Sequence, residues 1–507
     1  MERASVAPPE PAARSEVADK GLKRNAIGFV SSVVIGVAST APGYSLAAVL
    51  GLIVAAVGFQ GPAVLWVSFV PMLFIAAAYY YMNRADPDCG TTFSWVTRAM
   101  GPYLGWMGGW AIIVADIIVM ANLAQIAGLY TFLLFGWDAA AESTLAVTLV
   151  GVAWIAVMTT ICYIGIELSA RTQQFLLGAE ILTLAAFAIV ALVKVYAGDA
   201  LPTAVEPELS WFSPFAIDSF SALTTGVLIA VFIYWGWDST VTVNEESENS
   251  STGPGKAAIV ATLILVATYL IVSTAAQAYG GIEQIADSDD ALSKLAGEVF
   301  GSPLDKIVII AVLTSAAAST QTTILPTSRT ALSMARARAL PAYWGRVSAR
   351  HMTPSTATIW MGVLSIVWYV GLTLISENIL FDSIAALGLM IAFYYGLTGF
   401  ACTIYYRRVL LRSFKNFVLI GVAPTLGGLV LLWVFVKSCI DLSKPENSTA
   451  GESWLGLGPP LVIGIGFLLV GAVVMLIWRF GGHLDFFGRR PETADERLVE
   501  SAAAGRR

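Results

Sequence analysis

Three carboxylates stand inside or beside long apolar stretches of this sequence, where a charged group is costly. Asp116 lies in A-I-I-V-A-D-I-I-V-M, Glu180 ends R-T-Q-Q-F-L-L-G-A-E, and Asp238 follows I-Y-W-G-W. Ionisable residues inside membrane segments are functional candidates, because burial there costs free energy. Such a carboxylate can hold a proton, coordinate Na⁺ or pair with a cationic substrate. The apolar stretches around the three residues contain no evident Lys or Arg partner, so they favour a cation.

Two motifs interrupt apolar stretches with residues that do not suit a continuous helix. The first is S-T-A-P-G-Y-S at 39–45, in which Pro42 removes a backbone donor and Gly43 adds conformational freedom. The second is I-Y-W-G-W-D-S at 233–239, in which Gly236 stands between two tryptophans. Irregular backbone is tolerated in hydrocarbon only where it lines a cavity or is buried in protein. We therefore predict two helix breaks, at Pro42–Gly43 and at Gly236.

A plainer interpretation of each motif stays open at this point. The first motif is also compatible with a simple proline kink, which membrane helices tolerate. The second is compatible with Asp238 lying near a membrane surface, solvated beside Glu245 and Glu246. Together, discontinuous helices at matching places in two halves of a chain indicate a transporter with inverted repeats. Because helix N-termini suit a carboxylate and free carbonyls suit an ammonium, such a pair of breaks fits a zwitterionic amino acid.

Membrane spans are the elements that position these residues. The chain has 507 residues, of which 57% are hydrophobic and only 13% charged, with a mean hydropathy of +0.74. A spanning helix needs roughly 20 apolar residues. Twelve such stretches lie near 26–57, 61–83, 102–134, 143–164, 172–197, 220–243, 257–280, 304–332, 356–376, 382–405, 417–437 and 458–480. The sequence thus predicts an all-α integral membrane protein with about twelve transmembrane helices.

The basic residues orient the predicted spans. Twelve spans place both termini on one side, and the side richer in Lys and Arg is cytoplasmic. With cytoplasmic termini, 24 of the 29 Lys and Arg residues lie inside. The five that lie outside are Lys194, Lys294, Lys306, Lys437 and Lys444. We expect a multi-pass plasma-membrane protein, bacterial by its Ala- and Gly-rich composition, with no signal peptide, a disordered cytoplasmic tail at 1–24 and a second tail at 483–507.

Several other functions find no support in the residues. The four cysteines and two histidines form no CxxC pair or Cys/His cluster, which argues against a metal site, a disulfide framework and a metal-dependent enzyme. No Walker A run is present, so ATP does not drive the protein directly. A channel filter such as T-V-G-Y-G is missing too. The scattered basic residues make no nucleic-acid footprint. We expect neither a cofactor nor enzymatic activity.

Three further segments carry recognisable patterns. They are M-N-R-A-D-P-D-C-G-T-T-F-S-W-V-T-R-A-M-G-P-Y-L-G-W-M-G-G-W at 82–110, E-E-S-E-N-S-S-T-G-P-G-K-A at 245–257 and S-T-Q-T-T-I-L-P-T-S-R-T-A-L-S-M-A-R-A-R-A-L-P at 319–341. They resemble the P-x-x-G-G-x-Y…G-P-x-x-G-F…G-W, E-x-x-N-P-x-R/K and S-R…M-A-R-D-G-x-L-P patterns of the amino acid–polyamine–organocation superfamily of permeases. Cys89 departs from the glycine pair of the first pattern. The resemblance covers about residues 22–440.

The resemblance implies a leucine-transporter-like fold with alternating access around a central site. Spans 1–5 and 6–10 would form inverted repeats with broken spans 1 and 6. The transporter core would cover 25–405, and two peripheral spans would follow at 406–482.

The resemblance also places a substrate site at the two breaks. We expect the substrate carboxylate to meet span 1 around Ser39, Thr40, Ala41 and Gly43. We expect the substrate ammonium to meet carbonyls of span 6 around Phe232, Ile233, Tyr234 and Trp235, with Gly236 allowing the break. Phe232 or Trp235 is a candidate aromatic gate, and F-Y-Y-G at 393–396 a candidate lid. Hydroxyls bonded to their own helix and ordinary aromatic packing remain the alternatives.

Candidates for coupling or gating are Asp116, Glu180, Asp238, Ser319 and Thr320. Some proton-coupled members of the superfamily carry a lysine where Glu180 stands. Sodium-coupled folds of this class place hydroxyl ligands where Ser319 and Thr320 fall. A structural role for Glu180, or simple packing of small residues in span 8, stays open.

These expectations describe a secondary active transporter that moves an amino acid across the plasma membrane, with proton symport as the expected coupling. The alternative is a transporter of cationic amino acids, polyamines or other organic amines, by exchange or with Na⁺ as coupling ion. Its expected partners are this small-molecule substrate and membrane lipid, without nucleic acid.

Overall fold

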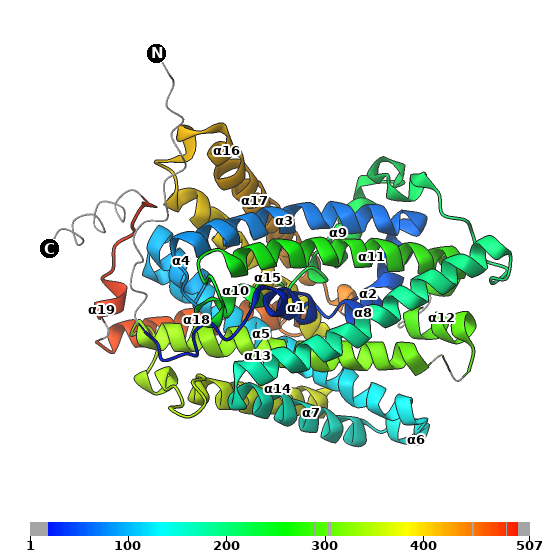
Figure 1. Ribbon diagram of the computed structural model, residues 1–507, viewed down its shortest axis with the longest axis horizontal. Coiled ribbons are helices and arrows are strands. Elements are labelled where there is room, and N and C mark those ends of the chain that lie inside the picture. The colour runs from blue at the N-terminus through cyan, green and yellow to red at the C-terminus, as the bar shows by residue number, and fades with distance from the viewer. Residues whose placement is uncertain are drawn as a thin grey trace, which may run out of the picture.

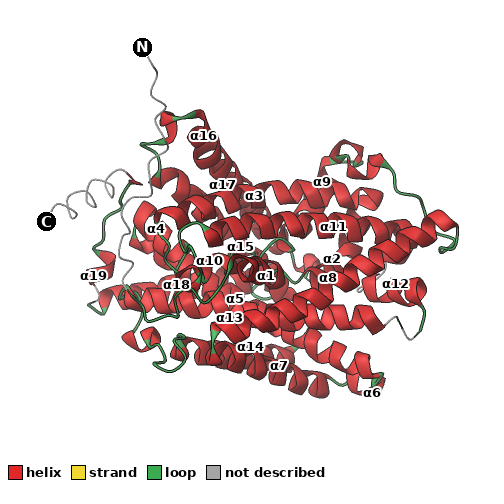
Figure 2. Cartoon of the chain, in the orientation of Figure 1, coloured by secondary structure: helices red, strands yellow, loops and turns green. Residues whose placement is uncertain are grey.

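The computed structural model describes residues 19–286, 291–302, 304, 306–448, 451–482 and 484–494. Within these ranges the chain forms helices and no β-strand, as Figure 2 shows. The longer helices are α1 (Phe29–Ser39), α2 (Pro42–Val57), α3 (Gly61–Ala85), α5 (Pro102–Phe135), α7 (Thr144–Ile164), α8 (Ile166–Ala197), α9 (Phe220–Phe232), α11 (Gly253–Ala286), α13 (Lys306–Arg336), α14 (Ser355–Ile375), α15 (Glu377–Tyr405), α17 (Ala423–Leu442) and α18 (Pro459–Phe480). The shorter ones are α4 (Thr92–Met100), α6 (Asp138–Ala141), α10 (Ser239–Thr242), α12 (Ala291–Phe300), α16 (Phe414–Asn416) and α19 (Leu484–Phe487), and a π-helical segment, Phe417–Val422, leads into α17.

Ten helical segments of the described residues are long and apolar enough to cross a membrane. One of them, Phe29–Ala85, runs through α1, α2 and α3 and therefore contains the first two predicted spans. The sixth predicted span is divided between α9, a shorter apolar helix, and α10. All twelve predicted stretches contain helix, which confirms the all-α membrane fold.

The central helices are α5 and α13, which pack against each other. In each of them, 78% of the most apolar window is buried inside the protein, compared with 22% in α18. The small residues S-A-A-A-S-T in the middle of α13 let neighbouring helices approach closely. The protein core therefore lies along α5 and α13, with α18 at the periphery.

Both described ends of the chain lie at the same end of the molecule. Near the N-terminus, Lys20 pairs with Asp88, and near the C-terminus the backbone N–H of Glu492 donates to the carbonyl of Arg98 at 2.7 Å. We call this the α4 end; Figure 1 shows α4 and α19 there, and α6 and α12 at the opposite, α12 end. An even number of membrane crossings agrees with this placement.

The predicted tails fall mostly outside the described residues. Those parts of them that the structure describes pack against the helices. Lys20 and Leu22 are buried, and Phe486 of α19 stacks on Phe93 with ring centroids 5.6 Å apart. Lys20 and Leu22 therefore belong to the folded α4 end, whereas Asp19, Gly21 and Arg24 beside them are exposed.

Candidate functional site

The first predicted break separates α1 from α2. α1 ends at Ser39, α2 begins at Pro42, and Ala41 between them is left-handed, with φ 48° and ψ 63°. A left-handed residue other than glycine costs about 1–2 kcal/mol. Proline suits the first position of a helix, where its missing N–H breaks no helical bond. The break is confirmed, but it lies at Thr40–Ala41 and not at Pro42–Gly43, because the proline starts the second helix.

The second predicted break separates α9 from α10 and is confirmed at Gly236. α9 ends at Phe232, α10 begins at Ser239, and Gly236 between them has φ 115°. A Cβ atom on Gly236 would lie 2.6 Å from the carbonyl oxygen of Ser39, the last residue of α1. The hydroxyls of Ser39 and Ser239 are 2.7 Å apart. The two breaks are therefore in direct contact, although about 200 residues separate them.

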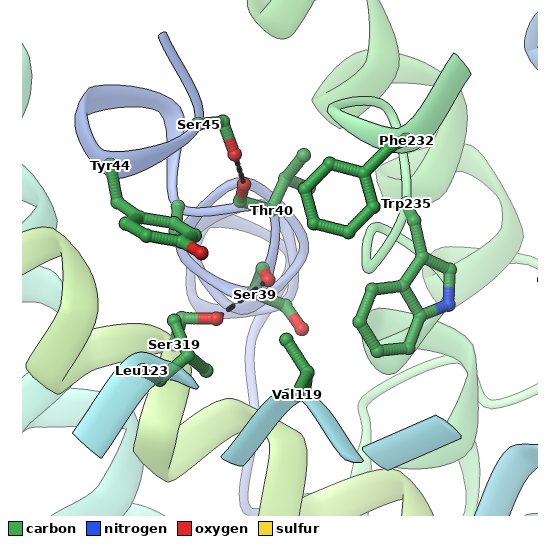
Figure 3. A pocket seen from close by; sticks show the side chains of 10 residues that line it. Ser39, Thr40, Tyr44, Ser45, Val119, Leu123, Phe232, Trp235 and Ser319 are labelled. Atoms are coloured by element: carbon green, nitrogen blue, oxygen red, sulfur yellow. Dashed lines mark hydrogen bonds between the residues drawn. The ribbon is translucent and has the colours of Figure 1, made fainter. Parts of the chain in front are cut away.

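A small pocket lies where the breaks meet, and Figure 3 shows its lining. Tyr44 faces it from one side, with Phe232 and Trp235 on the other. Its volume of about 10 Å³ is near the minimum for one water molecule. The lining consists of Ser39, Thr40, Ala41, Tyr44, Ser45, Val119, Leu123, Phe232, Trp235 and Ser319. These side chains therefore leave no room for a molecule much larger than water.

The pocket contains some of the predicted site residues and omits others. Those that line it are Ser39, Thr40, Ala41, Phe232, Trp235 and Ser319. Those outside its lining are Gly43, Asp116, Glu180, Ile233, Tyr234, Gly236, Asp238 and Thr320. Tyr44, Ser45, Val119 and Leu123 line it without having been predicted. Val119 and Leu123 are ordinary apolar residues of α5, so no local signal marks them.

Hydroxyl groups around the first break make two kinds of hydrogen bond. Thr40 donates to the carbonyl of Gly36 in its own helix at 3.0 Å, as the plainer interpretation held. Ser319 of α13 donates to the carbonyl of Ser39 at 3.0 Å and so ties α13 to the end of α1. Thr320 donates within α13, to the carbonyl of Ala316. Of the two hydroxyls predicted in span 8, only that of Ser319 reaches the break.

Asp238 is buried beside the second break rather than solvated at a surface. Its carboxylate accepts hydrogen bonds from the hydroxyls of Tyr395 at 2.8 Å, Tyr394 at 3.3 Å and Tyr79 at 3.4 Å. The indole N–H of Trp235 donates to the hydroxyl of Tyr394. A chain of hydrogen bonds thus links the pocket wall to Asp238. The span-10 tyrosines do not line the pocket, and their hydroxyls bind Asp238.

Glu180 of α8 is fully buried at the start of α2. Its Oε1 atom accepts a hydrogen bond from the backbone N–H of Gly43 at 2.7 Å. The neighbouring N–H, that of Tyr44, donates to the hydroxyl of Ser315 at 3.2 Å. A carboxylate here complements the positive end of the α2 dipole.

Asp116 is buried away from the pocket. It accepts a hydrogen bond from the hydroxyl of Thr327, which joins α5 to α13. Asp116 therefore does not line the pocket, but it lies within electrostatic range of Asp238 at the second break.

The α4 end holds a cluster of charges that the sequence did not indicate. The ammonium of Lys20 lies 2.9 Å from Asp88 and 2.5 Å from Glu245, and we call these three residues the latch. Deeper in the protein, Arg329 of α13 pairs with Glu246 through two bonds of 2.7 and 2.9 Å. Because Lys20 belongs to a polar tail and its partners to loops, no pattern along the chain marks them as neighbours.

Electrostatics keep Lys20 and Asp88 of the latch charged, whereas burial raises the pKa of Glu245, the third residue. Burial alone would raise the pKa of Asp88, but the charge of Lys20 and hydrogen bonds from Ser333 and Gly90 hold it well below its usual range. Burial opposes the charge of Lys20, yet Asp88 and Glu245 raise its pKa well above the usual value. Ligand-type atoms of Asp88, Cys89 and Glu245 lie within 4.8 Å of one another, but the Lys20 ammonium already supplies a positive charge there.

Comparison with known proteins decides the family. The family model described as amino acid permease matches residues 24–477. The chain belongs to the amino acid permease family.

Three curated proteins are similar to it. An uncharacterised transporter of Mycobacterium tuberculosis is 26% identical over 67% of this permease and 72% of its own length. The branched-chain amino acid permease BcaP of Lactococcus lactis is 25% identical over 42% of this permease and 48% of its own length. The vacuolar cationic amino acid transporter 4 of Arabidopsis thaliana is 23% identical over 60% of this permease and 52% of its own length. The permease is thus a multi-pass membrane transporter and not an enzyme.

Proposed function

We propose that this permease is a secondary active transporter that carries an amino acid or a related amine across the plasma membrane, driven by protons. The observation that carries this proposal is the contact between the two helix breaks, with a pocket at their junction. Because each break can change its backbone bonds without unfolding a whole span, the junction suits a site that opens to either side in turn.

Glu180 and Asp238 are the proposed proton sites. Each is buried, and neither forms an ion pair with Lys or Arg among the described residues. Glu180 is bonded to the start of α2, and Asp238 is linked through Tyr394 to Trp235 in the pocket wall. A proton taken up at either carboxylate therefore changes the bonds that hold a break in place.

A second candidate is transport of cationic amino acids or organic amines, by exchange. The uncompensated carboxylates near the breaks favour a positively charged substrate. An arginine/ornithine antiporter of Latilactobacillus sakei is 23% identical to the permease over 60% of the permease and 64% of the antiporter.

The proposed orientation places both termini, and therefore the latch, in the cytoplasm. In that orientation we expect Lys20, Asp88 and Glu245 to close the cytoplasmic side of the pathway. Release of the substrate into the cell requires that the latch open.

Uptake into proteoliposomes tests the proposed function. A panel of amino acids and amines is offered with and without proton and sodium gradients. We expect a proton gradient to drive uptake, and Glu180→Gln and Asp238→Asn each to lower the proton-driven component at least about tenfold. Glu283→Gln, at an exposed residue of α11, is the matched control and keeps wild-type uptake. Unchanged pH-dependent uptake in both buried-site variants contradicts the assignment of these proton sites.

A further inference from the structure

The start of α2 is the place in this site where a substrate carboxylate would find backbone donors. In this structure those donors are in use. Thr40 and Ala41 donate to the carbonyls of Val37 and Ala38 at 3.1 Å, and Pro42 has no N–H. The next two N–H groups, of Gly43 and Tyr44, donate to Glu180 and Ser315. The positive end of α2 therefore already holds a carboxylate, and that carboxylate belongs to the protein.

The side chains that line the pocket also have few donors to offer. The hydroxyls of Thr40, Ser45 and Ser319 all donate to backbone carbonyls. The hydroxyl of Tyr44 donates to Asn122, and the indole N–H of Trp235 donates to Tyr394. One hydroxyl hydrogen remains, on the Ser39–Ser239 pair, because only one of these hydroxyls donates to the other. Lys, Arg and His do not line the pocket.

Hydrogen-bond acceptors are left over around the breaks, together with two buried donors outside the pocket lining, the indole N–H of Trp237 and the amide nitrogen of Asn122. The carbonyls of Tyr234 and Trp235 receive no hydrogen bond from the described part of the chain. The second carboxylate oxygen of Glu180, Oε2, is buried and also has no hydrogen-bond partner among the described residues. A buried acceptor without a donor is costly and points to a partner that arrives with a ligand. An ammonium supplies such donors and a carboxylate does not.

We propose that Glu180 takes the place of a substrate carboxylate at α2, so that the site selects organic ammonium ions that have no free carboxylate. This inference rests on the proposed function, which makes the pocket the substrate site. A zwitterionic amino acid would have to displace Glu180 from Gly43 and leave two carboxylates close together in a buried site. An amine without a carboxylate avoids both costs.

Matched pairs of compounds test the selectivity. Each pair joins an amino acid to its decarboxylated amine: lysine with cadaverine, tyrosine with tyramine, leucine with isopentylamine. The methyl ester of each amino acid keeps the side chain but blocks the carboxylate. Binding to the purified full-length permease in detergent is measured by the rise in its melting temperature. In proteoliposomes, each compound is tested for how well it competes with the uptake of a radiolabelled amine. We expect the tightest amine and its ester to bind at least tenfold more tightly than the parent amino acid. Equal or tighter binding of the amino acids overturns the inference.

Two variants of Glu180 separate its charge from its hydrogen bond. Glu180→Gln keeps an oxygen that can accept from Gly43 but removes the charge, so we expect the amine-to-amino-acid preference to fall about fivefold. Glu180→Ala also frees the N–H of Gly43, and we expect the amino acid to bind at least as tightly as the amine. Glu283→Gln, at the exposed residue of α11 used above, is the control, because it removes a carboxylate outside the site, and it keeps the wild-type preference. If Glu180→Ala does not fold, the Gln variant still decides, since an unchanged preference there overturns the inference.

The two proposals fail in different ways. If neutral amino acids are taken up with protons and amines are not, the proposed transport stands and the selectivity by Glu180 is wrong. If no compound is taken up under any gradient while amines still bind selectively, the selectivity stands and the proposed transport is wrong.

Discussion

At the scale of single residues, Asp238 shows how a carboxylate is kept inside the membrane region with no basic partner in the described part of the chain. Three tyrosine hydroxyls donate to it, from α3 and from consecutive positions of α15. Hydrogen bonds to a charged group contribute about 1.5–3 kcal/mol each. Because the tyrosines come from two helices, the carboxylate also joins α3, α15 and the second break.

Replacing one tyrosine measures this contribution. Tyr395→Phe removes the 2.8 Å bond to Asp238 but keeps the ring, which packs edge-on against Tyr79 with centroids 5.8 Å apart. We expect a loss of about 1–3 kcal/mol in stability, seen as a lower melting temperature in detergent, and slower proton-driven uptake in proteoliposomes. The control is Tyr196→Phe, at an exposed position of α8. Melting temperature and uptake that match the control contradict the assigned role of the tyrosine.

At the scale of elements, the two breaks depend on each other. Gly236 adopts a positive φ in which side chains are strained, and it lies against the last carbonyl of α1. Only a residue without Cβ fits there, so the second break can lie this close to the first only when residue 236 is glycine. This contact holds the two interrupted spans together at the pocket.

Gly236→Ala tests this dependence. The added methyl group combines a strained φ, worth about 1–3 kcal/mol, with a contact of 2.6 Å to the carbonyl of Ser39. We expect a lower melting temperature and a strong loss of uptake. Gly178→Ala is the matched control, because it lies inside α8 with no atom within 4 Å of the new Cβ; alanine favours a helix by about 1 kcal/mol over glycine. The same uptake in both variants is the result that contradicts the contact between the breaks.

Sequence reasoning reached these elements because their signals are local. Proline, glycine and twenty-residue apolar runs act through nearby backbone, so the sequence predicts the spans and the presence of both breaks. The exact position of the first break was missed by two residues, since proline can either end or begin a helix. The partner of Glu180 was also missed, because Gly43 lies on another span and is brought close only by packing.

At the scale of the whole molecule, buried ion pairs join three separate segments of the chain at the α4 end. The latch joins the segment before α1 to the α3–α4 connection and to the segment after α10. Cys89 lies beside the latch, fully buried, with its sulfur 3.5 Å from the Lys20 ammonium. Burial raises the pKa of the Cys89 thiol well above its usual value, so the thiol is protonated and poorly reactive while the latch is closed.

Opening of the latch is therefore measurable at Cys89. In a variant whose other three cysteines are replaced by alanine, Lys20→Gln should raise the rate of maleimide labelling of Cys89 at least severalfold. Lys23→Gln is the control, since Lys23 forms a surface ion pair with Glu167, and exposed pairs contribute little. Equal labelling rates in the two variants contradict the role of the latch.

The ratio of the two labelling rates should not change between pH 6 and pH 8. Because the folded pKa of Asp88 is depressed, the stability that its charge contributes is fully present above the ordinary pKa of aspartate. This stability is lost only as the pH falls through the folded pKa. Because the folded pKa of Lys20 is raised, the stability that its charge contributes is fully present below the ordinary pKa of lysine. This stability is lost only as the pH rises through the folded pKa. Neither limit lies near neutral pH. A ratio that changes strongly in this window places the relevant titration elsewhere.

The amino-acid sequence alone specifies a membrane protein of about twelve helical stretches, two of them broken, with carboxylates in its apolar regions. Composition, proline, glycine and apolar length act along the chain, so these features need no knowledge of the fold. Only the tertiary structure decided which groups meet: Glu180 at the start of α2, the tyrosines at Asp238, and Lys20 between Asp88 and Glu245. Hydrogen bonds and ion pairs act over a few ångströms between residues far apart in sequence, so their partners are set by how the helices pack.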